Sequence, residues 1–172
     1  MKRKFVDFKV LTASLCCAVV MGVISFVFLK MLGLSSVFRE YFPYCIWFLP
    51  LSGMLTAFVY KKYGGESSKG NNLIIQSANE GVKVPKRLAV LTFFFTLLTH
   101  FSGGSAGREG AALQLGGSIA SSFGRIFQLN EREGRIMTMC GMAGAFSAIF
   151  GTPLAATIFT LEVVDVGSMQ YA

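Results

Sequence analysis

The sequence has 172 residues, of which 53% are hydrophobic and only 15% carry a charged side chain. Soluble globular proteins carry about 25% charged residues, so this composition favours a membrane protein and excludes intrinsic disorder, collagen-like repeats and a secreted disulfide scaffold. Part of the net charge of +7 comes from short basic clusters beside apolar runs, such as Lys2–Lys4 and Lys61–Lys62. This pattern is typical of juxtamembrane anchors on the cytoplasmic side. Because no base-stacking motif accompanies the charge, we expect no nucleic-acid partner.

Two apolar runs are long enough to cross a lipid bilayer. The first covers residues 10–32, and the absence of a small-residue cleavage site after it favours a retained helix over a signal peptide. The second covers residues 41–60 and contains Pro43 and Pro50, which predict a tilted or kinked helix. Basic residues precede the first run and follow the second, so both of these ends are expected on the cytoplasmic side. We therefore expect a multi-pass protein of the cell (inner) membrane with its N-terminus in the cytoplasm.

The later apolar segments are shorter and begin or end at glycine or proline. After a polar break at 63–70, we expect helices over residues 71–79, 86–101, 109–127, 132–150 and 153–165. Interrupted helices of this kind place their N-termini, with free N–H groups and a positive dipole end, against an anion inside a bilayer. The sequence therefore predicts an all-α integral membrane protein with tilted and half-length helices that acts as a transporter or channel.

The tetrad Gly107-Arg108-Glu109-Gly110 lies in a stretch, residues 103–124, that holds seven of the 19 glycines. An ionisable residue between membrane segments indicates a functional site, and a carboxylate at a helix start is favoured by the dipole. Such a carboxylate mimics an anion, and protonation would release it from the site. The competing interpretation is a surface loop in which Arg108 and Glu109 only cap a helix.

Three further polar positions are candidates. Gly70-Asn71-Asn72 could begin a helix whose N–H groups face an anion, although a plain N-cap explains the same pattern. Glu162 is a secondary candidate, which either serves a proton relay or lies at the aqueous end of its helix. His100 is interpreted as a structural group that is satisfied within its own helix.

Small residues spaced four apart in the segment 132–150 favour close helix packing, namely Gly141 with Ala145 and Gly144 with Ala148. The sequence contains no P-loop ending, nucleophile elbow or cluster of metal-ligand spacing. We therefore expect no enzyme activity, no cofactor and no metal site.

These residues resemble the CLC family of chloride channels and anion/proton exchangers. Gly107–Gly110 is similar to the family's Gly-Lys/Arg-Glu-Gly-Pro element, with Ala111 in place of proline. The stretch Phe150–Glu162 is similar to its Phe-Asn-Ala-Pro-Leu-Ala-Gly element and the following helix, and Gln114–Gly117 also fits. The resemblance implies an anion site at converging helix N-termini, with Glu109 as the residue for gating and proton transfer, and a homodimer for the intact family. The anion-binding candidates are Gly70, Asn71, Asn72, Gly107, Arg108 and Gly110.

Two departures indicate a branch of the family. Asn71 stands where chloride-transporting members have serine, which resembles the bacterial fluoride/proton antiporters. Val163 replaces the second of two adjacent glutamates that chloride exchangers use for protons. The resemblance therefore implies fluoride export coupled to proton import, with a chloride channel or chloride/proton exchanger as the alternative.

The chain resembles only the first of the two inverted repeats from which CLC subunits are built, and the second repeat is absent. We expect residues 1–172 to form the N-terminal half of a transport domain or a truncated form, which does not transport by itself. The alternative is an inactive fragment or assembly element that needs a complementary second half.

Overall fold

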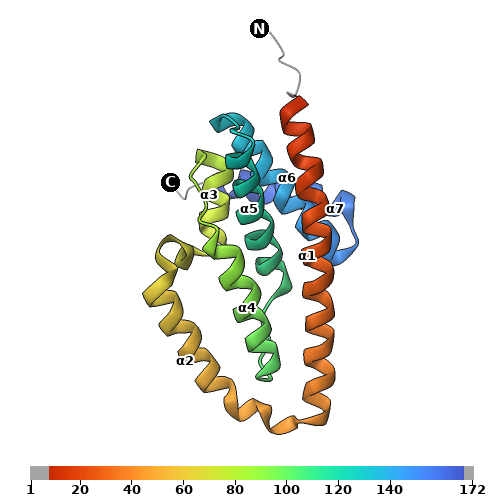
Figure 1. The fold of residues 1–172 in the computed structure, drawn as a ribbon, viewed down its shortest axis with the longest axis vertical. Helices are drawn as coiled ribbons and strands as arrows, with labels where there is room; N and C mark the ends of the chain where they lie inside the picture. Colours follow the sequence, from red (N-terminus) through yellow and green to blue (C-terminus); the bar gives the residue numbers. More distant parts are fainter. Residues whose placement is uncertain (1–7, 169–172) are drawn as a thin grey trace.

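The computed structural model describes residues 8–168, and all of the regular secondary structure within them is helical, as predicted (Figure 1). The α-helices are α1 (Phe8–Tyr41), α2 (Leu49–Val59), α3 (Asn71–Glu80), α4 (Arg87–Phe101), α5 (Arg108–Ile126), α6 (Glu131–Phe150) and α7 (Pro153–Ser168). The bounds of α3, α4, α5 and α6 lie within one residue of those expected, whereas α7 extends beyond residue 165.

The first helix is longer than the hydrophobic run predicts. The expected end at Leu32 is wrong, because α1 continues to Tyr41. Ser35 and Ser36 follow the apolar run, and their hydroxyls donate to the Leu32 carbonyl at 2.7 and 3.3 Å. Their polar groups are thus satisfied within the helix, so that they do not end it.

The expected second span, residues 41–60, is not one helix. A 3-10 segment, Pro43–Phe48, precedes α2, and Pro50 lies in the first turn of α2, where proline is tolerated. The expected polar break at 63–70 is also helical, as a π turn (Tyr60–Gly64) and a 3-10 turn (Gly65–Lys69). Only Ser52 of α2 is buried, and Figure 1 shows this helix standing apart from the bundle.

Helices α5 and α6 form the centre of the bundle and approach each other through glycines. A Cβ on Gly141 of α6 would lie 2.5 Å from the carbonyl oxygen of Gly116 of α5, and a Cβ on Gly116 would lie 2.8 Å from the Cβ of Ala145. Close packing by Gly141 and Ala145 is therefore confirmed. The second expected pair is wrong: a Cβ on Gly144 would meet no atom within 4 Å, and Ala148 is exposed.

A second close approach fixes α3 against α5. A Cβ on Gly117 would lie 2.5 Å from Cγ2 of Ile74, so the α3 side chain packs directly on the α5 backbone. Ile74 is fully buried in a core cluster with Leu73, Leu113 and Met142 from α3, α5 and α6. This packing sets where the N-termini of α3 and α5 lie relative to each other.

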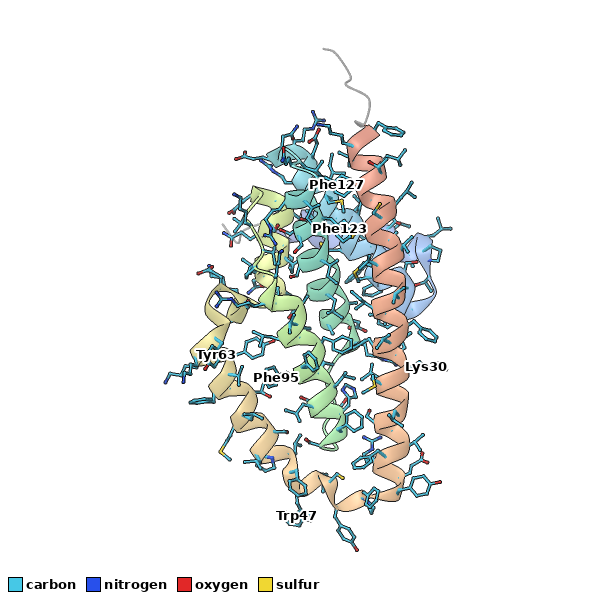
Figure 2. The ribbon with its side chains drawn as sticks, in the orientation of Figure 1. Lys30, Trp47, Tyr63, Phe95, Phe123 and Phe127 are labelled. Atoms are coloured by element: carbon cyan, nitrogen blue, oxygen red, sulfur yellow. The ribbon has the colours of Figure 1, made fainter. Side chains whose placement is uncertain are left out.

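The outer faces of α1 and α2 are apolar and exposed. Phe26 of α1 is 62% exposed and Trp47, before α2, is 80% exposed. Figure 2 shows Trp47 at the end of the bundle opposite Phe123 of α5 and Phe127, which caps α5. By length and composition, α1 and the helical stretch Pro43–Glu80 could each cross a membrane. An apolar surface of this extent fits contact with lipid.

Gly141→Ala is expected to lower the free energy of unfolding by about 2 kcal/mol, because overpacking a tight contact typically costs about 1–3 kcal/mol. The matched control is Gly144→Ala in the same helix, where the added methyl group meets no atom. Alanine is also the better helix former there, by about 1 kcal/mol. Unfolding in mixed micelles, followed by circular dichroism, measures both variants, and equal stabilities would contradict this account of the α5–α6 contact.

Candidate functional site

The N-termini of α3 and α5 lie side by side within the bundle. Asn71 is the first residue of α3, and Gly110 lies in the first turn of α5. A Cβ on Gly110 would lie only 3.0 Å from Nδ2 of Asn71. The first turn of each helix has backbone N–H groups without intrahelical partners and carries the positive end of the helix dipole. Two positive helix ends are thus brought to one place.

Gly70 sets the direction in which the chain enters α3. Its backbone has φ 55° and ψ −125°, a conformation that essentially only glycine adopts without strain. A Cβ at this position would also lie 3.3 Å from Nε2 of Gln114. Both the backbone conformation and the available space therefore call for glycine before Asn71.

A chain of side-chain hydrogen bonds orients the amide of Asn71. Nε2 of Gln114 donates to Oδ1 of Asn71 at 2.8 Å, and Oγ1 of Thr92 donates to Oε1 of Gln114 at 2.6 Å. The acceptor of Asn71 is thus occupied, and its Nδ2 group is left to donate elsewhere. The plain N-cap interpretation of Asn71 is wrong, because Gly70 is the N-cap residue and no side-chain cap bond forms.

A groove of about 330 Å³ adjoins this chain of hydrogen bonds. It lies between α2, α4 and the start of α5, and hydroxyl and amide groups line it among apolar helices. Its polar side chains are those of Thr56, Tyr60, Thr92, Thr96, Thr99 and Gln114, and the glycines Gly107 and Gly110 form part of its wall. Polar groups within a membrane bundle mark ion or substrate paths more often than lipid contacts.

The structure does not bring all predicted site residues together. Gly70, Asn71 and Gly110 meet, with Gln114 between the two helices. The side chains of Asn72, Arg108 and Glu109 are exposed, although Glu109 does lie in the first turn of α5. Gly107 is the N-cap residue of α5, in an extended conformation that turns the chain into the helix.

The two other candidate polar residues lie apart from the meeting point of α3 and α5. Glu162 is exposed on α7, which packs mainly against α6 and α3. His100 bonds through Nδ1 to the Thr96 carbonyl at 2.8 Å, which confirms that it is satisfied within its own helix. Of these, neither contributes to the groove at Gly110.

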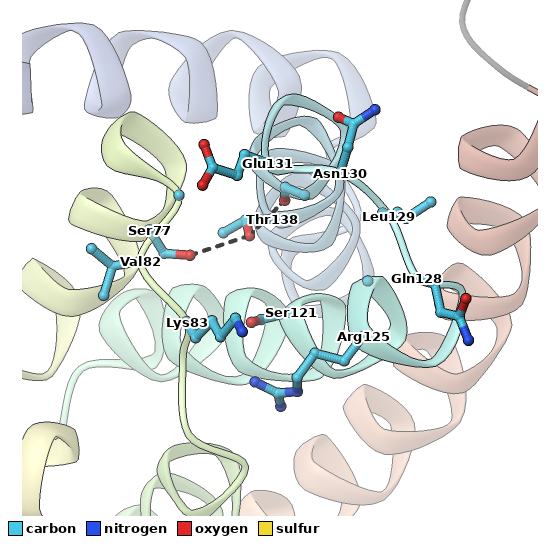
Figure 3. Close-up of a pocket in the computed structure, with 13 residues that line it drawn as sticks. Ser77, Val82, Lys83, Ser121, Arg125, Gln128, Leu129, Asn130, Glu131 and Thr138 are labelled. Carbon is cyan, nitrogen blue, oxygen red and sulfur yellow. Dashed lines mark hydrogen bonds between the residues drawn. The ribbon is translucent and has the colours of Figure 1, made fainter.

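A second polar pocket, of about 290 Å³, lies between the C-terminal ends of α3 and α5 and the start of α6 (Figure 3). The Ser77 and Thr138 hydroxyls are 3.5 Å apart at its wall. The sequence did not predict this pocket. Asn130 and Glu133 close the start of α6 with a reciprocal capping box. This pocket lies at the far end of α5, about 20 Å from Gly110 at 1.5 Å per residue. It is therefore separate from the Asn71 site.

Residues 52–172 match the family model described as voltage gated chloride channel. The chain belongs to this family. It is 37% identical over 155 residues to a protein of Pseudomonas syringae pv. tomato described as a chloride/fluoride channel protein. It is also 28% identical over 138 residues to a protein of Cronobacter sakazakii described as an H(+)/Cl(-) exchange transporter. The relatives of this family member are thus described as channels and exchange transporters.

A solved structure described as a CLC-type fluoride/proton antiporter is similar to this CLC chain with a TM-score of 0.81 and 42% identity. The match covers 88% of this chain and 38% of that one. The alignments with the Pseudomonas and Cronobacter proteins cover 90% and 76% of this chain, but 34% and 29% of those relatives. The CLC chain therefore spans about a third of the length of the relatives that it matches.

Gln114 and Thr92 are the residues that sequence reasoning left out of the site. Gln114 interrupts a helix of small and apolar residues, and Thr92 lies in the apolar helix α4. A polar side chain in such a segment usually needs a partner. That signal was present for Gln114, but the pairing of the two residues across α4 and α5 depends on the fold.

Gly70→Ala is expected to lower the free energy of unfolding by about 1–3 kcal/mol, which is the usual cost of a strained backbone conformation. Gly53→Ala in α2 is the matched control, because its Cβ would meet no atom within 4 Å. Denaturant titration in detergent micelles measures both variants. If the two have the same stability, the Gly70 conformation described above is not required.

Proposed function

We propose that this chain supplies the anion site of a fluoride/proton antiporter that exports fluoride and imports protons across the cell (inner) membrane, with its N-terminus in the cytoplasm. The observation that carries the proposal is the oriented amide of Asn71 beside two helix N-termini. The similarity to a CLC-type fluoride/proton antiporter supports it. The same helix ends would also suit chloride, so a chloride channel or chloride/proton exchanger is the alternative.

The donors at the site are compact. The Nδ2 group of Asn71 and the backbone N–H groups at Gly70–Asn72 and Gly107–Gly110 would replace water around the ion, with Arg108 adding positive charge at the start of α5. Fluoride is small and strongly hydrated, so it requires such donors at short range. Because the oxygen of Asn71 accepts from Gln114, its Nδ2 group is free to donate to the ion.

Glu109 would link the anion to the proton. As a carboxylate in the first turn of α5, it competes with an anion for the same positive helix end. When protonated, it loses that attraction and leaves the site to the anion. Alternation between these two states would couple one ion to the other without a second inner glutamate, since Val163 follows Glu162.

The proposed activity needs more than this chain. Because the chain spans about a third of its relatives, we expect it to work with a complementary second half, in a homodimer of the intact family. Alone in liposomes it is expected to release neither fluoride nor chloride. In the alternative, it acts only as an assembly element, and no complementary half would restore transport.

Glu109→Gln is expected to abolish proton-coupled fluoride movement, because the amide cannot take up or release a proton. The test uses a chimaera in which the remaining portion of the Pseudomonas syringae relative follows residue 172. Fluoride release and proton uptake are measured in liposomes with an ion electrode and a pH electrode.

Glu131→Gln is the matched control for this test, because Glu131 is an exposed carboxylate in the first turn of α6. It is expected to leave the coupling unchanged. Coupling that persists in Glu109→Gln contradicts the role given to Glu109, and an unsubstituted chimaera that folds but moves neither ion contradicts the proposed function.

Asn71→Ser is expected to lower the ratio of fluoride to chloride release by about tenfold or more, since a hydrogen bond to a charged group contributes about 1.5–3 kcal/mol and 1.4 kcal/mol is a factor of ten. Gln76→Ser on the same helix is the control, because Gln76 donates only to Glu80 on the exposed side. Fluoride and chloride release by the chimaera, from liposomes loaded with each salt, gives the ratio. Chloride release that already equals fluoride release without the substitution rejects the fluoride assignment.

A further inference from the structure

An apolar groove runs along α4 on a different face from the Asn71 site. Its volume is about 430 Å³, which lies within the range of cavities that hold small organic ligands. The groove lies between α1, α4 and α5, and its apolar lining includes Ile24, Ala89, Phe93, Phe94, Leu115 and Ile119. The anion groove uses Thr92, Thr96 and Thr99 of the same helix, so the two grooves lie on different sides of α4.

One end of this groove carries positive charge. Lys86, which is exposed, is part of the lining. Nη2 of Arg125 donates to Oγ of Ser122, another lining residue, at 2.9 Å, and Nη1 of Arg125 donates to the Val84 carbonyl at 2.7 Å. Arg125 is thereby held beside the segment that carries Lys86.

Two more cations are near Lys86 in the sequence but face other parts of the bundle: Lys83 lines the polar pocket of Figure 3, and Arg87 donates to the Tyr63 carbonyl at 3.3 Å. None of the cations Lys83, Lys86, Arg87 and Arg125 has a carboxylate oxygen of the described residues within 4 Å. The ion pair that the described part of the chain does form joins Lys69 and Glu66, away from this groove. The basic end of the groove therefore has uncompensated positive charge, which is complementary to an anionic group.

The rims of the groove are of the kind that faces lipid. Val90 and Phe94 of α4 are 54% and 63% exposed, and Val27 of α1, one turn from Ile24, is 44% exposed. From Lys86 to Phe94 the groove follows α4 for about 12 Å, close to half of a hydrocarbon core of about 30 Å. An acyl chain whose headgroup lies at Lys86 would thus reach nearly to the middle of the bilayer.

From these features we infer that the groove binds one acyl chain of an anionic phospholipid, whose headgroup is held by Lys86. The apolar lining selects a hydrocarbon chain, and the basic end selects the negative charge. One cation near a membrane surface favours an anionic over a zwitterionic lipid by about fivefold. The site does not depend on the proposed transport activity.

Native mass spectrometry of the purified chain, titrated with phosphatidylglycerol or with phosphatidylcholine of the same acyl chains, tests this inference. The unsubstituted chain is expected to retain one phosphatidylglycerol about fivefold more tightly than phosphatidylcholine. Lys86→Gln is expected to remove most of that preference, whereas Lys61→Gln, outside the groove, should leave it unchanged. Ala89→Trp fills the groove and is expected to abolish retention of both lipids, whereas Leu55→Trp on the exposed face of α2 should not.

Several results would overturn the inference. These are equal retention of the two lipids by the unsubstituted chain, equal losses in Lys86→Gln and Lys61→Gln, and lipid retained by Ala89→Trp. If the unsubstituted chain forms dimers that contain no lipid, and Ala89→Trp disrupts those dimers, the groove would be assigned to a second copy of the chain. Loss of the bound lipid in the chimaera with the Pseudomonas relative would assign it to a segment of the second half. Circular dichroism checks that every variant keeps its helices.

Discussion

Backbone N–H groups at a helix start have no partner within their own helix, and an apolar bilayer offers them none. In this chain two such starts, those of α3 and α5, lie against each other inside the bundle. Gly110 has no Cβ to hold them apart, and Asn71 fits into the space that results. An arrangement of this kind is stable only if another polar group or an anion meets the N–H groups. The two helix starts therefore need a hydrogen-bond acceptor or an anion at this point.

The rest of the bundle keeps those two helix starts in place. The contact of Gly116 with Gly141 holds α5 on α6, and Ile74 on Gly117 holds α3 on α5. Polar pairing then acts at a finer level, because Thr92 orients Gln114 and Gln114 orients Asn71. Backbone contacts thus determine where the helices begin, and side-chain hydrogen bonds determine which atom of Asn71 is available.

Much of this arrangement could be predicted from the sequence, for identifiable physical reasons. Glycine and proline marked the starts of α3, α5 and α7, and the spacing of Gly141 and Ala145 gave the packed face of α6. The end of α1 could not be predicted from hydropathy, because Ser35 and Ser36 bond back to the helix. The pairing of Thr92 with Gln114 joins two helices, so it required the fold. The role of Glu109 stays a prediction, since its side chain is exposed in this chain.

The length of α1 has a consequence for how the protein meets its membrane. Its 34 residues make a rod of about 50 Å, longer than a bilayer of about 40–45 Å including the headgroups. An upright rod would push the aromatic residues near Tyr41 into water, whereas a lean of roughly 30° keeps both ends at the interfaces. Because α1 packs along α6, the lean of one sets that of the other. Bilayer thickness would then determine the tilt of the whole helix bundle in the membrane.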